Sequence, residues 1–350
     1  MLNLSFTTLE LEDLSLPQTL TCTRLFENYL FDAKKTGNFL TLSIDQNTTF
    51  QWQEGDSGVD GSTIVVVGQG LNLWVLSQLC FAIAGKDALV ECSASNYYMT
   101  YAKQVLRLTF SETVLPSQAQ LLDVAEQFHV DLHVKPEKTS LSKPGLLVMD
   151  MDSTIIDIEC IDEIGALANV KEKISEVTEQ AMRGEIAFTD SLKYRVACLE
   201  GVAIDKLNSI RSRLPFMPGF LATMRVLQQH EWYLAIASGG FTYFADYVQA
   251  VAGLNEAHSN TLEVKDGKLT GKVIGNIVDG DKKASILKSL QQNQNIAEHQ
   301  TVAMGDGAND LIMMGAADLG VAYHAKPTVQ ESADVAINVG TFESLLYILE

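Results

Sequence analysis

The feature that most constrains the fold is a run of four apolar residues, Leu146–Met149, that ends in two acids. Four consecutive apolar residues are typical of a short strand that is buried on both faces of a parallel sheet. Asp150 and Asp152 follow this strand, ahead of Ser153 and Thr154. In an open α/β sheet, ligands bind at the carboxyl ends of the strands. We therefore expect both carboxylates to face one crevice at that edge.

Two acids at a strand end suit phosphoryl transfer. The carboxylate of Asp150 can attack phosphorus and hold the phosphoryl group as an acyl-phosphate. The carboxyl group of Asp152 can protonate the leaving oxygen and later accept a proton from water. Because neighbouring acids raise each other's pKa, one of them can stay protonated near neutral pH. A solvated turn also fits this pattern, whereas a calcium loop does not, since its Gly and Glu positions hold Ile155 and Ile161.

Composition limits the classes of function that fit. A chain of 350 residues allows about two domains, and a hydrophobic fraction of 47% is enough for packed cores. The formal net charge of −19 argues against binding to nucleic acid or to an anionic membrane. An enzyme of this charge that handles phosphate needs a cation and a few basic side chains in its pocket.

The cysteines and the N-terminus predict a soluble, cytoplasmic protein. The five cysteines are scattered and include no CxxC pair, which is typical of buried thiols in a reducing compartment. The N-terminal segment lacks the basic and apolar regions of a signal peptide. No apolar run is long enough to span a bilayer.

The first part of the chain predicts an α+β domain. Residues 1–60 give no clear structure beyond a weak alternation at Phe39–Ile44, and a polar, proline-containing linker follows residue 134. Between residues 61 and 138 the order of predicted elements is β-α-β-β-α-β, the ferredoxin-like arrangement. This order resembles that of ACT domains, which bind amino acids, although a domain for dimerisation or packing fits as well. The predicted strands are Thr63–Val67, Ala88–Ser93, Val105–Phe110 and Asp131–Val134, and the helices are Leu71–Ala84 and Ser117–Phe128.

An all-helical cap is predicted directly after the first strand of the C-terminal part, at about residues 157–213. A cap over the strand tip would exclude water, protect an acyl-phosphate and strengthen charge interactions beneath it. Apolar residues recur at helical spacing in Glu159–Ala168, Lys171–Arg183, Thr189–Leu199 and Ile204–Leu214.

A second buried strand, Trp232–Ala237, ends in Ser238 and two glycines before a predicted helix, Phe241–Ala252. A hydroxyl group beside free N–H groups at a helix N-terminus is an anion site. A plain turn from strand to helix also fits these residues. Further on, Leu262–Leu269 is a hairpin signal around Asp266-Gly267.

A third strand, Gln300–Met304, runs into Gly305-Asp306-Gly307-Ala308-Asn309-Asp310. The glycines let the backbone turn sharply and leave Asp306 at the strand tip, where it could meet Asp150 across a metal ion. Oxygen ligands of this kind suit Mg²⁺, and Asp310 would support them. A Gly/Asn/Asp turn fits this stretch alone, but three strand tips with groups suited to phosphate outweigh that alternative.

Two lysines, Lys282 and Lys283, open the helix before this third strand. Such a pair is usually solvated, but one of them at the strand-tip edge could neutralise a phosphate. The strands Leu319–Ala322 and Val335–Val339 complete the predicted parallel sheet.

With these residues identified, residues 145–350 resemble the haloacid dehalogenase superfamily, and within it the phosphoserine phosphatases. The resemblance implies a Rossmann-type parallel sheet with the helical cap inserted, a fold of the α/β class. It also implies that Lys283 rather than Lys282 is the phosphate lysine, on its spacing to Ile286 and Leu287. The four superfamily motifs correspond to Asp150-Met151-Asp152-Ser153-Thr154, Ser238-Gly239, Lys283 and Gly305-Asp306-Gly307-x-Asn309-Asp310.

The resemblance extends into the cap, where substrates are selected. It implies that Glu159 binds the substrate's ammonium group and Arg195 its carboxylate, with Met182 and Phe188 as an apolar wall. Ser238, Gly239 and Lys283 would bind the transferring oxygens, and Asn309 would orient the phosphate or the metal. Mg²⁺ would be held by Asp150, the backbone carbonyl of Asp152, and Asp306.

The reaction implied is the Mg²⁺-dependent hydrolysis of O-phospho-L-serine to L-serine and phosphate, the last step of serine biosynthesis. It would proceed through an aspartyl-phosphate on Asp150. A related phosphatase or phosphotransferase for another small phosphate ester is an alternative, as is an amino-acid-sensing regulator with an inactive phosphatase half. The N-terminal domain could also support a homodimer.

Overall fold

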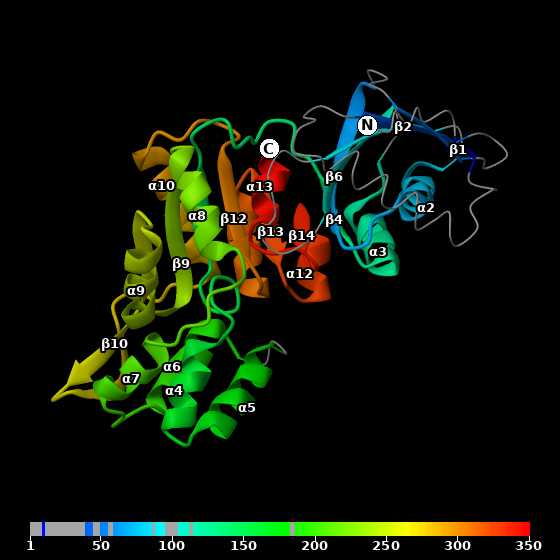
Figure 1. The fold of residues 1–350 in the computed structure, drawn as a ribbon. Coiled ribbons are helices and arrows are strands. Elements are labelled where there is room, and N and C mark those ends of the chain that lie inside the picture. Colours follow the sequence, from blue (N-terminus) through cyan, green and yellow to red (C-terminus); the bar gives the residue numbers. More distant parts are fainter. Residues whose placement is uncertain are drawn as a thin grey trace. The chain divides into compact units, whose positions relative to one another are not determined.

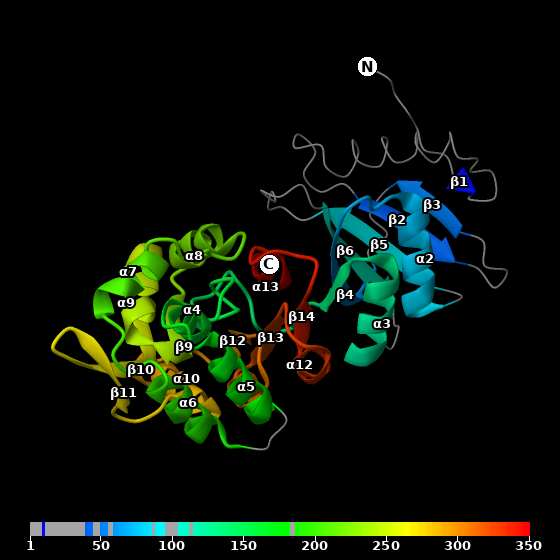
Figure 2. The same cartoon turned by 90° about the horizontal axis from the view of Figure 1, so that it is seen from below.

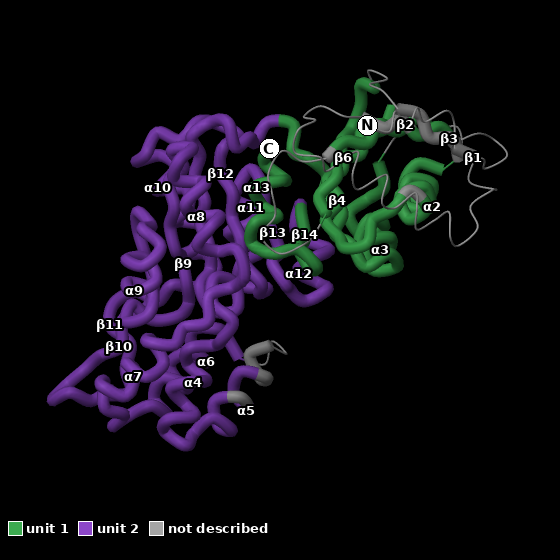
Figure 3. The backbone as a smooth tube through the Cα atoms, in the orientation of Figure 1, with its two compact units in different colours: residues 1–137, 335–350 green, residues 138–334 purple. Residues whose placement is uncertain are grey.

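The structure is a computed structural model that describes residues 9–10, 39–44, 50–54, 59–85, 88–94, 104–111, 115–182 and 186–350. The chain divides into two compact units (Figure 3). The first unit comprises residues 1–137 and 335–350, and the second comprises residues 138–334. Over the described part of the chain, no helix combines the length and the apolar character needed to cross a bilayer.

The first unit contains the predicted β-α-β-β-α-β order, which the structure confirms. Its strands pair antiparallel in the order β5-β6-β4-β7, while α2 and α3 lie side by side and share one core with the sheet (Figure 2). The resemblance to ACT domains stays a prediction. The elements are β4 (Gly61–Gly68), α2 (Leu73–Ala84), β5 (Leu89–Ala94), β6 (Gln104–Ser111), α3 (Gln118–Phe128) and β7 (Asp131–Val134).

Three strands from the N-terminal residues extend this sheet beyond β5, in the order β1-β3-β2-β5. They are β1 (Leu9–Glu10), β2 (Phe39–Ile44) and β3 (Phe50–Glu54). The alternation at residues 39–44 is therefore a true strand, whereas β1 and β3 were not predicted. The rest of the segment 1–58 lies outside the described residues.

The chain's last residues form what we call the C-terminal clasp, residues 338–350, on the first unit. Here the carboxylate of Asp131 accepts backbone N–H groups of Asn338, Val339 and Gly340 at 2.6–3.1 Å. The helix α13 (Ser344–Leu349) buries Tyr347 against Val65, Val67 and Val105. Alternation along β4 explains this contact, because Ile64 and Val66 face the helical core instead. The clasp thus covers the second face of the sheet.

The second unit has the predicted, mostly parallel sheet (Figure 1). Strand β8 (Leu146–Met149) lies between β9 (Tyr233–Phe241) and β12 (Thr301–Gly305), parallel to both. The order of the strands reverses at β8, since the connections from it lead to neighbours on opposite sides. At such a reversal the carboxyl ends of the strands border a crevice of the kind that binds ligands. β13 (Leu319–Tyr323) continues the sheet beyond β12, and β10 (Glu256–Lys265) with β11 (Lys268–Ile274) continues it beyond β9.

Helices flank this sheet or cover its tip. The sheet is accompanied by α8 (Phe220–Gln229), α9 (Thr242–Ala252), α10 (Gly280–Asn293), α11 (Leu311–Ala316) and α12 (Pro327–Ser332). Of these, α8 and α11 were not predicted. The cap consists of the four predicted helices, α4 (Cys160–Leu167), α5 (Lys171–Met182), α6 (Phe188–Ala197) and α7 (Ile204–Arg211).

The prediction for the end of β9 was wrong in one respect. The strand does not stop at Ala237 but runs to Phe241, and α9 begins at Thr242. The extension arises because β10 shifts register between His258 and Asn260, which lets Asn260 pair with Phe241. Ser238 and its glycines therefore lie in extended chain rather than at a helix N-terminus.

The predicted hairpin forms between β10 and β11, at Asp266 and Gly267, where φ is 53° and 74°. Positive φ at both positions is the geometry that Asp-Gly favours in two-residue hairpin turns. Backbone hydrogen bonds join the hairpin to the cap, from Gly201 N to Leu269 O and from Leu269 N to Val202 O, each 2.8 Å long. The hairpin is thus part of the cap's support.

Candidate active site and metal centre

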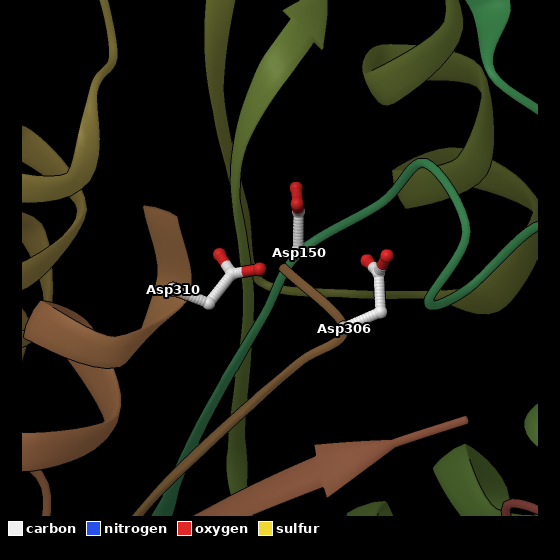
Figure 4. A group of neighbouring side chains, drawn as sticks. All are labelled: Asp150, Asp306 and Asp310. Atoms are coloured by element: carbon white, nitrogen blue, oxygen red, sulfur yellow. The ribbon is translucent and has the colours of Figure 1, made fainter. Parts of the chain in front are cut away.

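Three carboxyl groups meet at the ends of two neighbouring strands (Figure 4). Asp150 follows β8, Asp306 follows β12, and Asp310 lies in the short 3₁₀ helix η2 (Ala308–Asp310). One oxygen from each lies within 4.8 Å of the others. The register of the sheet sets this meeting, because Asp150 N donates to Met304 O at 2.9 Å and so aligns the two strand ends. Asp150 and Asp306, predicted at separate strand tips, therefore share one site.

Lys283 supplies the positive charge beside these acids. Its side chain is completely buried, and its Nζ lies 2.8 Å from Asp150 Oδ2 and 2.7 Å from Asp310 Oδ1. Burial lowers the pKa of Lys283, but the two carboxylates outweigh this effect and raise the pKa above its ordinary value. The amine therefore stays an ammonium group. The neighbouring Lys282 is exposed.

Gly305 and Gly307 of the fourth motif make room for the side chains of Asp310 and Asn309. A Cβ atom on Gly305 would lie 2.4 Å from Asp310 Cγ, and one on Gly307 would lie 2.3 Å from Asn309 Oδ1. Gly307 N also donates to Asp310 Oδ2 at 3.1 Å. Burial raises the pKa of Asp310 to about 6, although Lys283 works against this rise. Asp310 was predicted as a supporting residue, and the structure places its carboxylate in the acidic cluster itself.

The chemistry of the acidic cluster fits a divalent cation. Burial, and then the charges of Asp150 and Asp310, raise the pKa of Asp306 to about 8. Thr154 Oγ1, which was not among the predicted site residues, donates to Asp306 Oδ1 at 3.0 Å. Crowded carboxylates that hold protons this tightly gain most from a cation, and their oxygens are the ligands that Mg²⁺ prefers. These residues could therefore hold a metal ion.

We expect metal binding to release a proton and to strengthen as the pH rises. Because Asp306 has a pKa of about 8 without metal, Mg²⁺ must displace its proton below that pH. The Mg²⁺ affinity should fall about tenfold per pH unit from 8 to 6. Calorimetric titration in two buffers of different ionisation enthalpy would measure the proton released. An affinity that does not change between pH 6 and 8 would contradict this expectation.

Asp152 lies against the end of β9, in an environment suited to a general acid. It is 9% exposed, and a Cβ atom on Gly240 would lie 2.9 Å from its Oδ2. Burial, followed by the charges of Glu159 and Asp150, raises the pKa of Asp152 well above its ordinary value, while hydrogen bonds with Cys160 oppose the rise. A raised pKa favours the protonated form of this carboxyl group, which is the form that a general acid needs.

Ser238 lies at the same strand end, buried at 1% exposure. Its Oγ accepts the N–H of Gly240 at 3.0 Å, so one of the backbone amides predicted to be free is occupied. The neighbouring Gly239 faces the cap, since a Cβ atom there would lie 2.9 Å from Cζ of Phe188. Phe188 thus covers the strand tip, and Asn309 is half-buried on the opposite strand end.

Glu159 and Arg195, the two charged residues predicted to clamp the substrate, both belong to the cap, and each charge shifts the pKa of the other. Glu159 remains accessible to solvent, and Ser153 Oγ donates to its Oε1 at 2.8 Å. Partial burial raises the pKa of Glu159, whereas burial lowers the pKa of Arg195 and the charge of Glu159 opposes that shift. Arg195 also approaches Thr178 Oγ1 at 3.5 Å. The side chain of Met182, at the end of α5, lies outside the described atoms.

Comparison with known proteins identifies the family. The haloacid dehalogenase-like hydrolase family matches residues 147–315. A phosphoserine phosphatase from Haemophilus influenzae is 50% identical over 220 residues, which cover 63% of this chain and 70% of the relative. The chain belongs to the phosphoserine phosphatases of the haloacid dehalogenase-like hydrolase family. The resemblance seen in the sequence motifs is thereby confirmed.

Solved structures agree with this assignment. A crystal structure of a probable phosphoserine phosphatase from Vibrio cholerae, in unliganded form, has a TM-score of 0.68 at 39% identity and covers 82% of this chain and 86% of its own. A phospho-aspartyl intermediate analogue of phosphoserine phosphatase has a TM-score of 0.56 at 36% identity. That match covers 59% of this chain and 100% of the other.

Proposed function

We propose that the protein hydrolyses O-phospho-L-serine to L-serine and phosphate through an aspartyl-phosphate on Asp150. One observation carries the proposal: Asp150 and the buried Lys283 meet at 2.8 Å under a cap that presents Glu159 and Arg195. The sequence identity to phosphoserine phosphatases supports it. So does the relative in which a phospho-aspartyl intermediate analogue is seen.

The arrangement accounts for both half-reactions. An oxygen of Asp150 attacks phosphorus as the bond to the serine oxygen breaks, and Asp152 gives its proton to that oxygen. Water then attacks the phosphoryl group, Asp152 takes a proton from it, and the carboxylate of Asp150 is released. Lys283, Ser238 and Gly239 bind the transferring oxygens, because positioning and electrostatics supply most of the catalysis in phosphoryl transfer.

Magnesium would be held by Asp150, Asp306 and the backbone carbonyl of Asp152, with Asp310 and Asn309 beside them. When bound, the ion neutralises charge so that one anion can approach another.

Selectivity would come from the cap. Glu159, oriented by Ser153, binds the substrate's ammonium group, and Arg195 binds its carboxylate, while Phe188 and Met182 form an apolar wall. A substrate that lacks one of these charged groups leaves its partner unpaired in a partly buried site, which lowers the rate with that substrate. Phosphoethanolamine lacks the carboxylate and phosphoglycolate lacks the ammonium group, so a panel of these esters with phosphoserine tests the assignment. Similar turnover of all of them would favour another small phosphate ester.

We expect Glu159→Gln and Arg195→Ala to weaken the use of phosphoserine selectively. Loss of one charged partner should lower kcat/KM for phosphoserine about 10- to 100-fold, with a smaller effect on an aryl phosphate that carries neither group. Lys193→Ala, an exposed residue on the same helix as Arg195, is the matched control and should change neither activity. Equal losses on both substrates would contradict the role of the clamp.

The cysteines bear on the location of the enzyme in the cell. The described cysteines Cys80, Cys92, Cys160 and Cys198 are free thiols, which supports the predicted reducing, cytoplasmic location. A homodimer through the N-terminal unit stays a prediction. The acidic cluster and its lysine argue against a regulator with an inactive phosphatase half, since such a protein has no need of them.

A further inference from the structure

A buried amide joins two segments that carry phosphate-binding groups. Asn260, on β10, is 1% exposed. Its Nδ2 donates to Gly239 O at 2.8 Å, and its Oδ1 accepts from Val278 N at 2.9 Å. The side chain therefore uses a donor and an acceptor at once, in two defined directions.

One end of this bridge holds the tip of β9. Gly239 follows Ser238, and a Cβ atom on the next residue, Gly240, would lie 3.2 Å from Ser238 Oγ and 2.9 Å from Asp152 Oδ2. Gly239 itself packs against Phe188 of the cap. Because the bridge holds the carbonyl of Gly239, it fixes the orientation of the peptide group between Gly239 and Gly240. That peptide carries the N–H group that binds Ser238 Oγ at 3.0 Å.

The other end of the bridge holds the start of α10. Val278 precedes Asp279, the residue that caps α10 by accepting Lys282 N at 3.0 Å. Lys283 N in turn donates to Asp279 O at 2.9 Å. Lys283 thus lies one helical turn from the bridge, and its ammonium group contacts Asp150 and Asp310.

A polar residue at this position is not explained by packing. Burying an amide is unfavourable unless both of its polar atoms are bonded, and leucine would fill a similar volume without that requirement. The geometry points to Asn260 as a positioning residue, one that sets the place of Ser238 and Gly239 relative to Lys283. This inference rests on the proposed function, because it assumes that those groups bind the transferring phosphoryl group.

The test compares Asn260→Leu and Asn260→Asp with the wild-type enzyme at saturating Mg²⁺. Kinetics with phosphoserine and inhibition by inorganic phosphate give kcat, KM and the inhibition constant. We expect Asn260→Leu to raise the inhibition constant for phosphate and to lower kcat/KM by about 10- to 100-fold. Asn255→Ala is the matched control, because Asn255 Oδ1 accepts Leu234 N at 2.8 Å at the opposite end of β9. It should lower the melting temperature and leave phosphate inhibition unchanged.

The pH dependence of the Asn260→Asp variant separates a positioning role from a purely structural one. A protonated carboxyl group can donate to Gly239 O and accept from Val278 N as the amide does, whereas a carboxylate faces the carbonyl oxygen without a proton. The activity of Asn260→Asp relative to wild type should therefore rise as the pH falls from 8 to 5.5. Taking the ratio at each pH cancels the titration of groups that both proteins share.

Two results would overturn the inference. One is a normal phosphate inhibition constant and kcat/KM in Asn260→Leu despite a lower melting temperature. The other, decisive if the leucine variant does not fold, is an activity ratio for Asn260→Asp that does not change with pH. Failure of the proposed function would look different, because the wild-type enzyme itself would then not hydrolyse phosphoserine.

Discussion

Replacement of Asp150 by asparagine should abolish the turnover of phosphoserine, with kcat lowered ~10⁴-fold or more. The amide oxygen that takes the place of the nucleophile carries no negative charge, so the bond to phosphorus does not form. The fold should survive the change, because an amide oxygen can still accept the N–H of Met151, now 2.7 Å from Asp150 Oδ1. Lys283 also keeps its contact with Asp310.

The measurement is the amount of labelled phosphate attached to the protein when the reaction with labelled phosphoserine is quenched with acid. The wild-type protein should carry label, and Asp150→Asn should carry none. Asp281→Asn, an exposed acid in the first turn of α10, is the matched control and should behave as the wild type does. If the Asp150→Asn protein carried labelled phosphate, the nucleophile would have to be another residue.

Lys283→Met should have the largest effect on stability. The side chain is completely buried between Asp150 and Asp310, and its removal leaves carboxylates in a buried site without their cation. Breaking a buried ion pair in this way typically destabilises a protein by about 3–5 kcal/mol. Hydrolysis should be lost as well, since a charge that binds the transferring oxygens is gone. Lys282→Met, the exposed neighbour, should stay within about 0.5 kcal/mol of the wild type.

The destabilisation of Lys283→Met should also depend on pH in a definite direction. The pKa of Asp310 is already raised to about 6, and loss of Lys283 removes a charge that holds it down. A carboxyl group whose pKa is raised by folding destabilises the native state as the pH rises through that pKa. The deficit relative to wild type should therefore be larger at pH 8 than at pH 5.5. Urea unfolding at the two pH values measures it, and a deficit equal to that of Lys282→Met would contradict the prediction.

Much of the active site could be predicted because each part is marked locally. A buried apolar run followed by acids indicates a strand tip, and neighbouring parallel strands bring such tips together. Asp150 and Asp306 are therefore predictable from the sequence as members of one site. The resemblance to the family favours Lys283 over Lys282, and the structure shows that Lys283 is the buried one of the two. The period of the apolar residues predicts all four cap helices.

The remaining features depend on contacts between distant residues. The role of Asn260 depends on partners at Gly239 and Val278, and a single asparagine in a strand carries no signal of either. The extension of β9 to Phe241 requires a register shift in another strand, so local patterns end the strand too early. The sequence predicts only a supporting role for Asp310, because only the fold shows that its carboxylate contacts Lys283.

The C-terminal clasp has a consequence for how this protein is made. The strands of the first unit leave the ribosome early, but the partners of Asp131 and of the face formed by Val65, Val67 and Val105 emerge only after residues 138–334 have been translated. Until then an acidic side chain and an apolar patch of the nascent chain lack the groups that cover them. The last step in folding of the first unit therefore waits for residues 338–350, although most of its sequence comes first.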